Sequence, residues 1–322
     1  MKKDIRIIYM GTPDFAVPAL DKLVTDGYNV VGVVTMPDKA IGRHHETLQS
    51  SPVKKYAVAH NIPVLQPEKL KDDTFLEQLR GLQADLQIVV AFRMLPEIVW
   101  GMPRLGTFNL HAALLPQYRG AAPINWAIIN GDTETGLTTF FLDEHIDTGR
   151  IIRQVRVPIH ETDCAEDVHD RLMILGADLV EETVDLIIQD KADAIPQEEF
   201  TINEPLRPAP KIFHETCEIH WDELTCKHAY DFIRGLSPYP AAWSTLVSPE
   251  GKESMLKIYK TRRIEGKTNV QSGTIDSDGK TYLRVALSDG WLDLIEIQMS
   301  GKKRMQTTDF LRGIHINGYK FQ

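Results

Sequence analysis

Residues 108–123 read Phe108-Asn109-Leu110-His111-Ala112-Ala113-Leu114-Leu115-Pro116-Gln117-Tyr118-Arg119-Gly120-Ala121-Ala122-Pro123. The stretch begins as an apolar strand and ends as a loop punctuated by proline and glycine. Side chains alternate along a strand, so Asn109 and His111 lie on the same side. At the carboxyl end of a buried strand in an α/β protein, that side opens into the crevice where ligands bind. An amide donor beside a base that titrates near neutrality indicates acyl transfer.

The composition is that of an ordinary globular protein. The chain has 322 residues, of which 43% are hydrophobic and 25% charged, and this length predicts two domains. No apolar run approaches the ~20 residues that span a bilayer. The three cysteines are scattered and indicate no disulfide framework: Cys164, Cys217 and Cys226. We expect a cytoplasmic protein.

Charge is distributed unevenly along the chain. Residues 1–204 carry 19 basic and 31 acidic side chains, whereas residues 205–322 carry 17 and 14, so the net charge of −9 is the sum of −12 and +3. A mildly basic second half is compatible with an anionic partner. Ordinary scatter of surface charge explains the asymmetry equally well.

The first half of the sequence alternates strands and helices. We expect strands at Ile5–Met10, Val30–Thr35, Ile62–Leu65, Leu86–Ala91, Thr107–His111, Leu137–Leu142 and Ile151–Pro158, the last two as an antiparallel pair. We expect helices at Asp14–Thr25, from a Ser51 cap through Ala59, at Asp73–Leu82, within Ile124–Ile129 and at Ala165–Ile188. This succession predicts an α/β fold with a Rossmann-like, doubly wound, mostly parallel sheet.

Periodicity fails between Lys191 and Pro210, where prolines cluster, which indicates a linker. One short helix, Cys226–Arg234, follows, and then come strands separated by turn signals such as Ser288-Asp289-Gly290. This pattern predicts a small OB-like β-barrel. We therefore expect a catalytic domain at 1–190, a linker at 191–209 and a barrel domain at 210–322.

Two further motifs follow strands, and each has a plain alternative. Gly11-Thr12-Pro13 precedes the first helix, whose N-terminus offers N–H groups to anions, but a turn without a ligand is an open reading. Asp147-Thr148-Gly149 lies on a loop from which the carboxylate can reach back to His111 and orient it. A simple turn aspartate explains it as well. An aspartic protease is excluded because there is no second such triplet.

The segment Ala91-Phe92-Arg93-Met94-Leu95-Pro96 ends the strand that precedes the His111 strand. Its backbone is suited to bind the edge of a planar heterocycle, and a simple strand-to-helix turn is the alternative. The 11 histidines form no recognisable ligand spacing, and His44 and His45 are adjacent on an expected loop. We expect no metal.

These motifs together resemble the 10-formyltetrahydrofolate-dependent formyltransferases along nearly the whole chain. The resemblance rests on Met10–Pro18, on Asn109-Leu110-His111 followed by Leu114-Leu115-Pro116 and Tyr118-Arg119-Gly120, and on Asp147-Thr148-Gly149. Further matches favour the member of the family that acts on charged initiator tRNA: Ala209–Ile212 with Trp221, Ile233–Ala241, and Gly301-Lys302-Lys303 with Met305.

The resemblance implies transfer of a formyl group from 10-formyltetrahydrofolate, a co-substrate, to the α-amino group of methionyl initiator tRNA. It implies that Asn109, His111 and Asp147 are catalytic. The folate residues it implies are Phe92, Arg93, Met94, Leu95, Leu114, Leu115, Pro116, Tyr118 and Gly120. The tRNA residues it implies are Gly11, Thr12, Arg43, Arg119, Lys211, Arg234, Lys302 and Lys303. We expect a monomer whose partners are that tRNA and folate, with no membrane association.

The chain departs from the family pattern at several positions. Arg93 stands where glycine is usual, in a segment that is one residue shorter, which puts the folate contacts there in question. The loop Pro37–Leu48 has His44-His45-Glu46 after Gly42-Arg43, where lysines are usual. Either Arg43 carries more of the phosphate contact or the loop binds tRNA less tightly. Milder changes are Ala113 for serine and Gln117 for a basic residue.

Three other functions compete with this interpretation. A sibling enzyme that formylates an amino-sugar nucleotide shares the Asn-His-Asp set and has a second domain. A smaller formyltransferase of purine synthesis would lack residues 205–322. A non-catalytic RNA-binding protein would not need an intact set of Asn109, His111 and Asp147. The basic second half, the Pro37–Leu48 loop and Gly301-Lys302-Lys303 favour tRNA as the acceptor.

Overall fold

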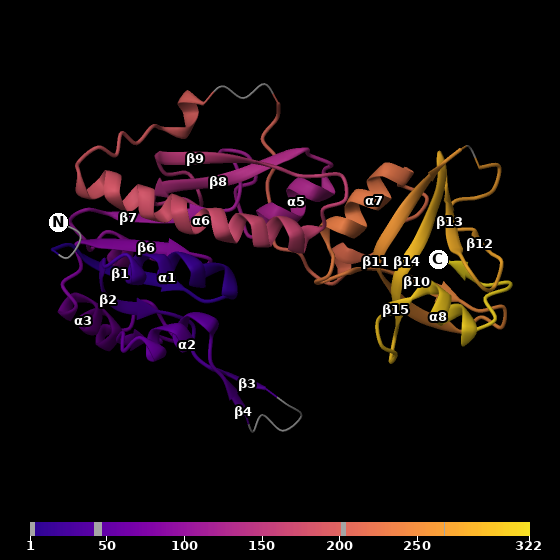
Figure 1. Cartoon of the computed structure of the whole chain (residues 1–322), viewed down its shortest axis with the longest axis horizontal. Helices are drawn as coiled ribbons and strands as arrows, with labels where there is room; N and C mark the ends of the chain where they lie inside the picture. Colours follow the sequence, from indigo (N-terminus) through magenta and orange to yellow (C-terminus); the bar gives the residue numbers. More distant parts are fainter. Residues whose placement is uncertain (1–3, 42–46, 201–203, 267) are drawn as a thin grey trace. The chain divides into compact units, whose positions relative to one another are not determined.

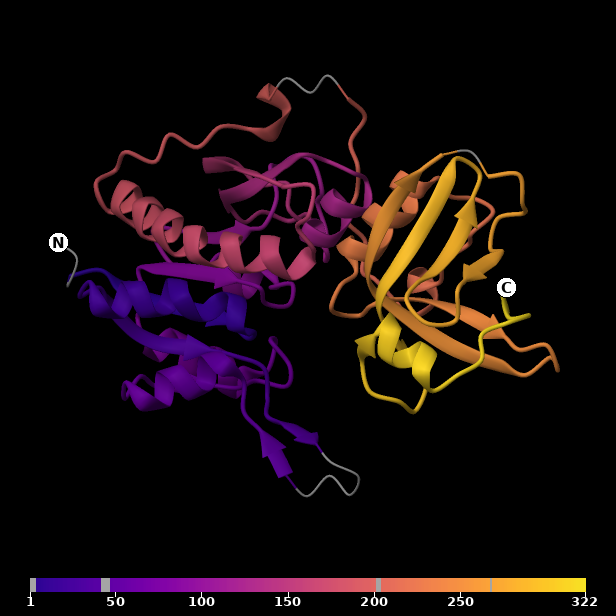
Figure 2. The same ribbon diagram turned by 45° about the vertical axis from the view of Figure 1, so that its right-hand side comes forward.

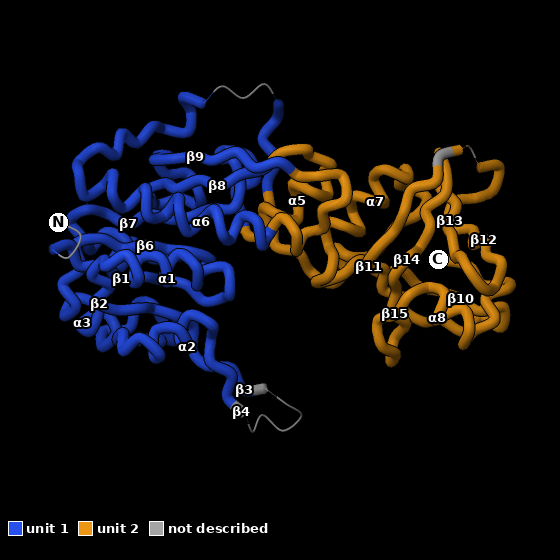
Figure 3. Tube along the Cα trace, viewed as in Figure 1, with its two compact units in different colours: residues 1–120, 135–158, 169–208 blue, residues 121–134, 159–168, 209–322 orange. Residues whose placement is uncertain are grey.

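The chain forms two compact units. The structure, a computed structural model, describes residues 4–41, 47–200, 204–266 and 268–322. The first unit comprises residues 1–120, 135–158 and 169–208, and the second comprises 121–134, 159–168 and 209–322 (Figure 3). The units therefore alternate along the chain.

This alternation differs from the expected boundaries, which divide the chain once, at residues 191–209. Two short segments, 121–134 and 159–168, belong to the second unit, and the expected linker residues 191–208 belong to the first. Hydrogen bonds between residues that are far apart in the sequence account for this difference. The Asn125 side-chain amide donates to the carbonyl oxygen of Gly235 (2.7 Å), and Arg234 Nη1 donates to that of Asp163 (2.8 Å). Periodicity does not reveal such contacts.

The first unit is built on a seven-stranded sheet in the order β5-β2-β1-β6-β7-β8-β9 (Figure 1). Its strands are β1 (Arg6–Gly11), β2 (Asn29–Val34), β5 (Val64–Leu65), β6 (Leu86–Val90), β7 (Thr107–His111), β8 (Glu134–Phe141) and β9 (Ile151–Pro158). The pairings from β5 through β7 are parallel, and β8 runs antiparallel to β7. The Rossmann-like, mostly parallel sheet is confirmed.

The helices of the first unit are α1 (Val17–Thr25), α2 (Pro52–Ala59), α3 (Asp73–Gly81), α4 (Glu97–Trp100) and most of α6 (Ala165–Ile188). Three of them, α2, α3 and α6, begin where the sequence predicted, and a short helix, α4, was not expected. Ser51 caps α2 by accepting the Lys54 N–H at 3.0 Å, as predicted. The helix expected at Asp14–Thr25 instead starts with a separate 3₁₀ turn, Asp14–Ala16, before α1.

The strand order places the carboxyl ends of β1 and β6 at the switch point of the sheet, and the end of β7 lies beside that of β6. The chain winds outward from β1 through β2 to β5, and then returns to the other side of β1 as β6 and β7. Ligands of open α/β sheets bind outside the carboxyl ends of strands where the order reverses. Gly11, Ala91 and His111 lie at the ends of β1, β6 and β7.

A two-stranded hairpin occupies the segment that was expected to be a loop. β3 (Lys39–Ile41) pairs with β4 (Thr47–Gln49) and projects from the rest of the first unit (Figures 1 and 2). At its base, Asp38 accepts hydrogen bonds from Lys54 (2.6 Å) and Gln66 (2.9 Å), and the bond from Lys54 holds the pKa of Asp38 below its usual value. Arg43, expected to contact tRNA, lies outside the described residues.

The second unit is a nearly closed antiparallel barrel, as predicted. Its strands are β10 (Ala242–Val247), β11 (Glu253–Glu265), β12 (Ile275–Ser277), β13 (Leu283–Leu287), β14 (Gly290–Met299), β15 (Met305–Gln306) and β16 (Lys320–Phe321). The order is β12-β13-β14-β11-β10-β16, and β15 pairs with β14. A bridge between Thr274 and Lys320 brings the two ends of the sheet together. Its apolar core includes Trp221, Ile233, Leu256 and Ile297.

Helices complete the second unit. α5 (Pro123–Ile129) and α7 (Cys226–Gly235) lie close together, and α7 packs on β11. The sequence predicted one short helix after the linker, but α8 (Thr307–Arg312) is a second one. Six residues contain too few apolar repeats to give a periodic signal. No helix within the described ranges of the chain is long and apolar enough to cross a membrane.

Candidate active site

Strand β7 carries the two polar side chains that the sequence singled out. Its Asn109 is half-buried, and His111, the last residue of the strand, is 6% exposed. β7 lies between β6 and β8, with Asn109 opposite Val89 on one side and Phe140 on the other. The neighbours of Asn109 in the sheet are apolar, whereas His111 lies opposite Thr138. Because His111 is buried, hydrogen bonds and charges at its ring act in a medium of low polarity.

The His111 imidazole lies between a carbonyl and a carboxylate. Its Nε2 is 2.8 Å from the carbonyl oxygen of Tyr118, and its Nδ1 is 3.8 Å from Asp147 Oδ2. A carbonyl oxygen only accepts, so Nε2 bears a proton and Nδ1 is the nitrogen that gains or loses one. The prediction that Asp147 reaches back toward His111 therefore agrees with the geometry.

Asp147 lies on the loop 142–150 between β8 and β9. Its Oδ2 accepts the backbone N–H of Gly120 at 2.9 Å, so the loop after His111 holds the carboxylate directly. Its φ of +57° is in the left-handed region. Gly149 follows at a position where a Cβ would lie 1.7 Å from the Phe141 carbonyl oxygen, which admits glycine alone.

Three segments that meet the expected site turn through left-handed residues. Besides Asp147, these are Ala91 at the end of β6 (φ +48°) and Tyr118 in the loop after β7 (φ +60°). Backbone strain of this kind persists only where the surroundings hold it, and it clusters at functional sites. The strained residues coincide with the three motifs that the sequence identified.

The loop after β7 is supported by residues that sequence reasoning missed. Thr138, fully buried on β8, donates to the carbonyl oxygen of Ala113 (2.6 Å) and accepts the Leu115 N–H (3.1 Å). Gln154 on β9 donates to the Leu115 carbonyl oxygen (2.7 Å). Thr138 and Gln154 lie on strands that carry no sequence motif. The strand alternation that turns their side chains inward is the one signal that could have pointed to them.

The expected linker also contacts this loop. The Tyr118 N–H donates to the Arg207 carbonyl oxygen (2.7 Å), and Arg207 Nη1 donates to the Tyr118 hydroxyl (3.1 Å). Gln197, buried in the same segment, contacts Arg119 and the Asp147 loop. Nothing in the sequence singles out Gln197 or Arg207, because the failing periodicity and the prolines of this segment indicate only a connection.

The expected folate residues after β6 are divided between surface and interior. Phe92 is half-buried, Met94 is exposed and Leu95 is buried. Arg93 donates to the backbone carbonyl oxygens of Pro67 and Glu68, and burial lowers its pKa. Its guanidinium thus ties this segment to the loop after β5, so Arg93 leaves the heterocycle to the backbone and to the exposed surface of Phe92 and Met94.

The expected folate residues after β7 have distinct surroundings. Leu115, Pro116 and Tyr118 are buried, whereas Leu114 and Gly120 are half-buried. Leu115 packs in a small cluster with Phe140 and Ile151. Leu114 and Gly120 therefore retain surface for a ligand, and the buried three shape the backbone.

Three expected tRNA residues of the first unit that the structure describes, Gly11, Thr12 and Arg119, contact other parts of that unit. A Cβ on Gly11 would lie 2.7 Å from that of Ala16, so this glycine permits close packing of the turn after β1. Thr12 Oγ1 accepts the Met36 N–H at 3.4 Å. Both guanidinium contacts of Arg119 go to the Gln197 side-chain oxygen (3.1 and 2.7 Å).

The expected tRNA residues of the second unit differ in exposure. Lys211, Lys302 and Lys303 are exposed, whereas Arg234 is 9% exposed and donates to Asp231 and to the carbonyl oxygens of His160 and Asp163. The buried Arg234 stabilises the unit and has no surface to offer a phosphate.

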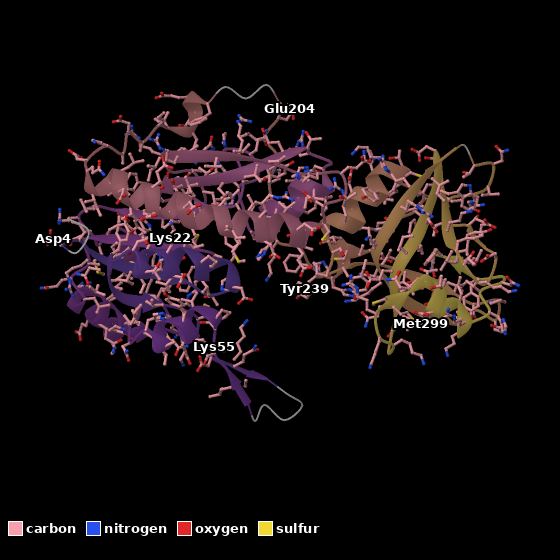
Figure 4. All side chains as sticks on the ribbon, viewed as in Figure 1. Asp4, Lys22, Lys55, Glu204, Tyr239 and Met299 are labelled. Carbon is pink, nitrogen blue, oxygen red and sulfur yellow. The ribbon has the colours of Figure 1, made fainter. Side chains whose placement is uncertain are left out.

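Lys211 lines a cavity of about 450 Å³ in the second unit. Aromatic side chains share this lining, among them Phe213, Trp243 and the 84% exposed Tyr239, labelled in Figure 4. Lys257 lies there as well. Cationic and aromatic side chains in one cavity suit a nucleic-acid ligand.

The first unit brings two of the three predicted catalytic residues, His111 and Asp147, together. The third, Asn109, lies on the same face of β7 as His111. The two segments expected to bind folate, after β6 and after β7, belong to the same unit. Within the described part of the chain, no group of three or more histidine, cysteine, aspartate or glutamate side chains could hold a metal ion.

Two family models match the chain: formyl transferase over residues 3–184, and the formyl transferase C-terminal domain over residues 211–315. Curated relatives named methionyl-tRNA formyltransferase align along almost the whole chain. The protein from Parabacteroides distasonis is 64% identical over 97% of this chain and 96% of its own length. That from Bacteroides thetaiotaomicron is 62% identical over 99% of each chain. The chain therefore belongs to the formyl transferase family, and within it to the methionyl-tRNA formyltransferases.

Solved structures share the fold at low sequence identity. HypX from Aquifex aeolicus in complex with tetrahydrofolic acid has a TM-score of 0.63 at 16% identity, covering 95% of this chain and 47% of that one. An N-formyltransferase from Helicobacter canadensis, in complex with folinic acid and dTDP-3-aminofucose, has a TM-score of 0.62 at 19% identity, covering 94% and 100%. These likenesses support the fold.

Proposed function

We propose that the chain transfers the formyl group of 10-formyltetrahydrofolate to the α-amino group of methionyl initiator tRNA, and that Asn109, His111 and Asp147 carry the reaction. The observation that supports these roles is the placement of His111 between the Tyr118 carbonyl and the Asp147 carboxylate, at the end of a central strand. Full-length relatives at 64% identity support tRNA as the acceptor.

The reaction needs charge stabilisation and one proton transfer. The amine nitrogen attacks the formyl carbon, a new C–N bond forms, and the bond from that carbon to N10 of folate breaks. Negative charge develops on the formyl oxygen, where a positioned donor contributes roughly 3 kcal/mol. Asn109 donates through its amide, and His111 adds a donor when Nδ1 is protonated.

The proton leaves the attacking amine and ends on N10 of the departing folate. Asp147 and Nδ1 of His111 are 3.8 Å apart, so the two act as one acid–base pair that takes this proton directly or through a water molecule. Such catalysis contributes about 10²–10⁴ in rate. No covalent intermediate is required, so the pathway uses no serine or cysteine nucleophile.

The folate is held by the segments after β6 and β7. Phe92, Met94, Leu114 and Gly120 retain exposed surface for it, and the backbone of the 91–96 segment offers hydrogen bonds to the edge of the pterin ring. Arg93 acts indirectly, by tying that backbone to Pro67 and Glu68.

The tRNA is held by cations of both units. Lys211, Lys302 and Lys303 are exposed and are assigned to its phosphates, together with Arg43. Arg119 and Arg234 leave this set, since their guanidinium groups bond to protein atoms. Gly11 and Thr12 remain at the end of β1, where an acceptor end would enter. The proposal includes a monomer working in the cytoplasm.

A transfer assay tests the function. Purified protein is mixed with 10-formyltetrahydrofolate carrying a labelled formyl group and with charged initiator or elongator methionyl-tRNA in parallel. We expect label on the initiator and little on the elongator, and transfer slowed at least about a hundredfold with Asp147→Asn. No transfer to either tRNA, with label appearing on an amino-sugar nucleotide instead, would overturn the tRNA assignment and keep the fold.

A further inference from the structure

Gln197 is a buried side chain that the mechanism above does not use. It begins a 3₁₀ turn, Gln197–Glu199, within the segment that the sequence indicated as a linker, and it is 1% exposed. Its Nε2 donates to two backbone carbonyl oxygens, that of Asp147 and that of Gly149, both at 2.9 Å. The amide therefore holds the loop on both sides of Thr148.

The oxygen of the same amide is also occupied. Oε1 accepts from Arg119 Nε at 3.1 Å and from Arg119 Nη2 at 2.7 Å. Arg119 immediately precedes Gly120, whose N–H donates to Asp147 Oδ2 at 2.9 Å. Hydrogen bonds and two chain segments thus form a closed ring through Asp147, Gln197, Arg119 and Gly120.

This ring acts on a backbone that does not hold its conformation unaided. Asp147 has a φ of +57°, and such strain persists only where the surroundings impose it. All the hydrogen-bonding capacity of the Gln197 amide is used, and the group is shielded from water, which makes the restraint rigid. Loss of its donors would leave two carbonyl oxygens of the loop without these partners.

We propose that Gln197 is a positioning residue for catalysis: it fixes the Asp147 carboxylate against His111 through the ring with Arg119 and Gly120. The inference rests on the proposed role of Asp147. It gives the 191–208 segment a part in the chemistry, since the residue that aligns the catalytic loop comes from outside that loop.

Gln197→Glu is the first test, because it preserves volume and removes both donors. We expect kcat to fall about 10²-fold, the scale set by a misplacement of about 1 Å. KM for each substrate should stay within about threefold, since binding is not the step that is lost. Arg150→Ala is the matched control: Arg150 Nε bonds to the Ala194 carbonyl oxygen, which anchors the same segment without contacting the ring. Unchanged kcat in Gln197→Glu would overturn the inference.

A double-mutant cycle separates positioning from general structural damage. If Gln197 acts through Asp147, Gln197→Ala lowers kcat strongly in the wild type but has little further effect on Asp147→Asn. If the fold loss of kcat in the double mutant equals the product of the losses in the two single mutants, Gln197 acts independently of Asp147. If Gln197→Ala fails to fold, Arg119→Ala replaces it in the same cycle, because it removes the neighbouring member of the ring.

Amide hydrogen exchange gives a readout that needs no activity. The Gly120 N–H donates to the carboxylate that Gln197 positions, so it should exchange faster in Gln197→Glu while amides of β7 keep their protection. Unchanged protection at Gly120 would overturn the inference even if the enzyme acted on another acceptor. An absence of formyl transfer by the wild type would instead contradict the proposed function.

Discussion

The imidazole Nε2 of His111 donates a hydrogen bond to the carbonyl oxygen of Tyr118, seven residues further along the chain, at 2.8 Å. This bond selects the tautomer, because only a protonated Nε2 can donate to a carbonyl. It leaves Nδ1 facing the Asp147 carboxylate at 3.8 Å. The turn that places Tyr118 there thus decides which nitrogen of His111 faces Asp147, the nitrogen to which we assign the proton transfer.

The acid–base pair predicts a large loss of turnover. His111→Ala and Asp147→Asn should each lower kcat by about 10²–10⁴, with folate binding nearly intact, because the pair acts on the proton that moves during transfer. The double mutant should be no slower than the slower single mutant, since the two residues act as a unit. Single-turnover kinetics and folate titration measure both quantities. A single mutant with more than about a tenth of wild-type turnover would contradict the assignment.

Thr138→Val should disturb the site through its supporting strand. The valine is of similar size but leaves the Ala113 carbonyl oxygen and the Leu115 N–H without their buried partner, which costs about 1–3 kcal/mol per group. Both unfolding free energy and kcat should fall. Thr139→Val is the control, because Thr139 bonds to Thr183 and not to the catalytic loop. Equal losses of kcat in the two variants would show that the support is not specific.

Arg234→Ala should lower stability and leave tRNA use intact. It removes the donor to the Asp231 carboxylate and to two carbonyl oxygens, while Lys227 remains 2.5 Å from Asp231, so unfolding free energy should fall by about 1–3 kcal/mol. The exposed pair between Arg312 and Asp309 gives the control, for which Arg312→Ala should cost less than about 1 kcal/mol. Denaturant unfolding measures both. A stable Arg234→Ala protein with a raised KM for tRNA would restore the phosphate role.

Arg43→Ala should weaken tRNA use in a salt-dependent way. A phosphate contact releases counterions, so the variant should raise KM for tRNA and reduce the slope of its salt dependence by about 1. Arg80→Ala removes the same charge from the exposed end of α3 and should leave the slope unchanged. Kinetics at several salt concentrations make the comparison. Equal slopes for all three proteins would exclude this contact.

Local signals in the sequence were sufficient to predict the main elements of the proposed active site. β7 was expected at Thr107–His111 and α6 at Ala165–Ile188, and the structure has both with these bounds. Strand alternation placed Asn109 and His111 on one face, and the motif around Asp147 suggested its partner. Each of these depends on neighbours within a few residues, which periodicity and capping report directly.

Contacts between residues that are distant in the sequence could not be predicted from such local signals. Arg119 and Arg234 looked like free cations, yet one bonds to Gln197 and the other to Asp231, His160 and Asp163. The proline-rich 191–208 segment looked like a connection, yet it packs with the first unit. The sequence does not distinguish a basic side chain that faces water from one that donates to a buried acceptor.

The sequence by itself determined most strands and helices of the first unit, the mostly parallel sheet and the barrel that follows it, and it led to the hypothesis that Asn109, His111 and Asp147 act together. Only the tertiary structure decided the tautomer of His111, the placement of Asp147 by Gly120 and Gln197, and the division of the chain into alternating units. The physical reason is range: secondary structure follows from local sterics and the hydrophobic period, whereas each buried hydrogen bond needs a partner that folding brings from elsewhere in the chain.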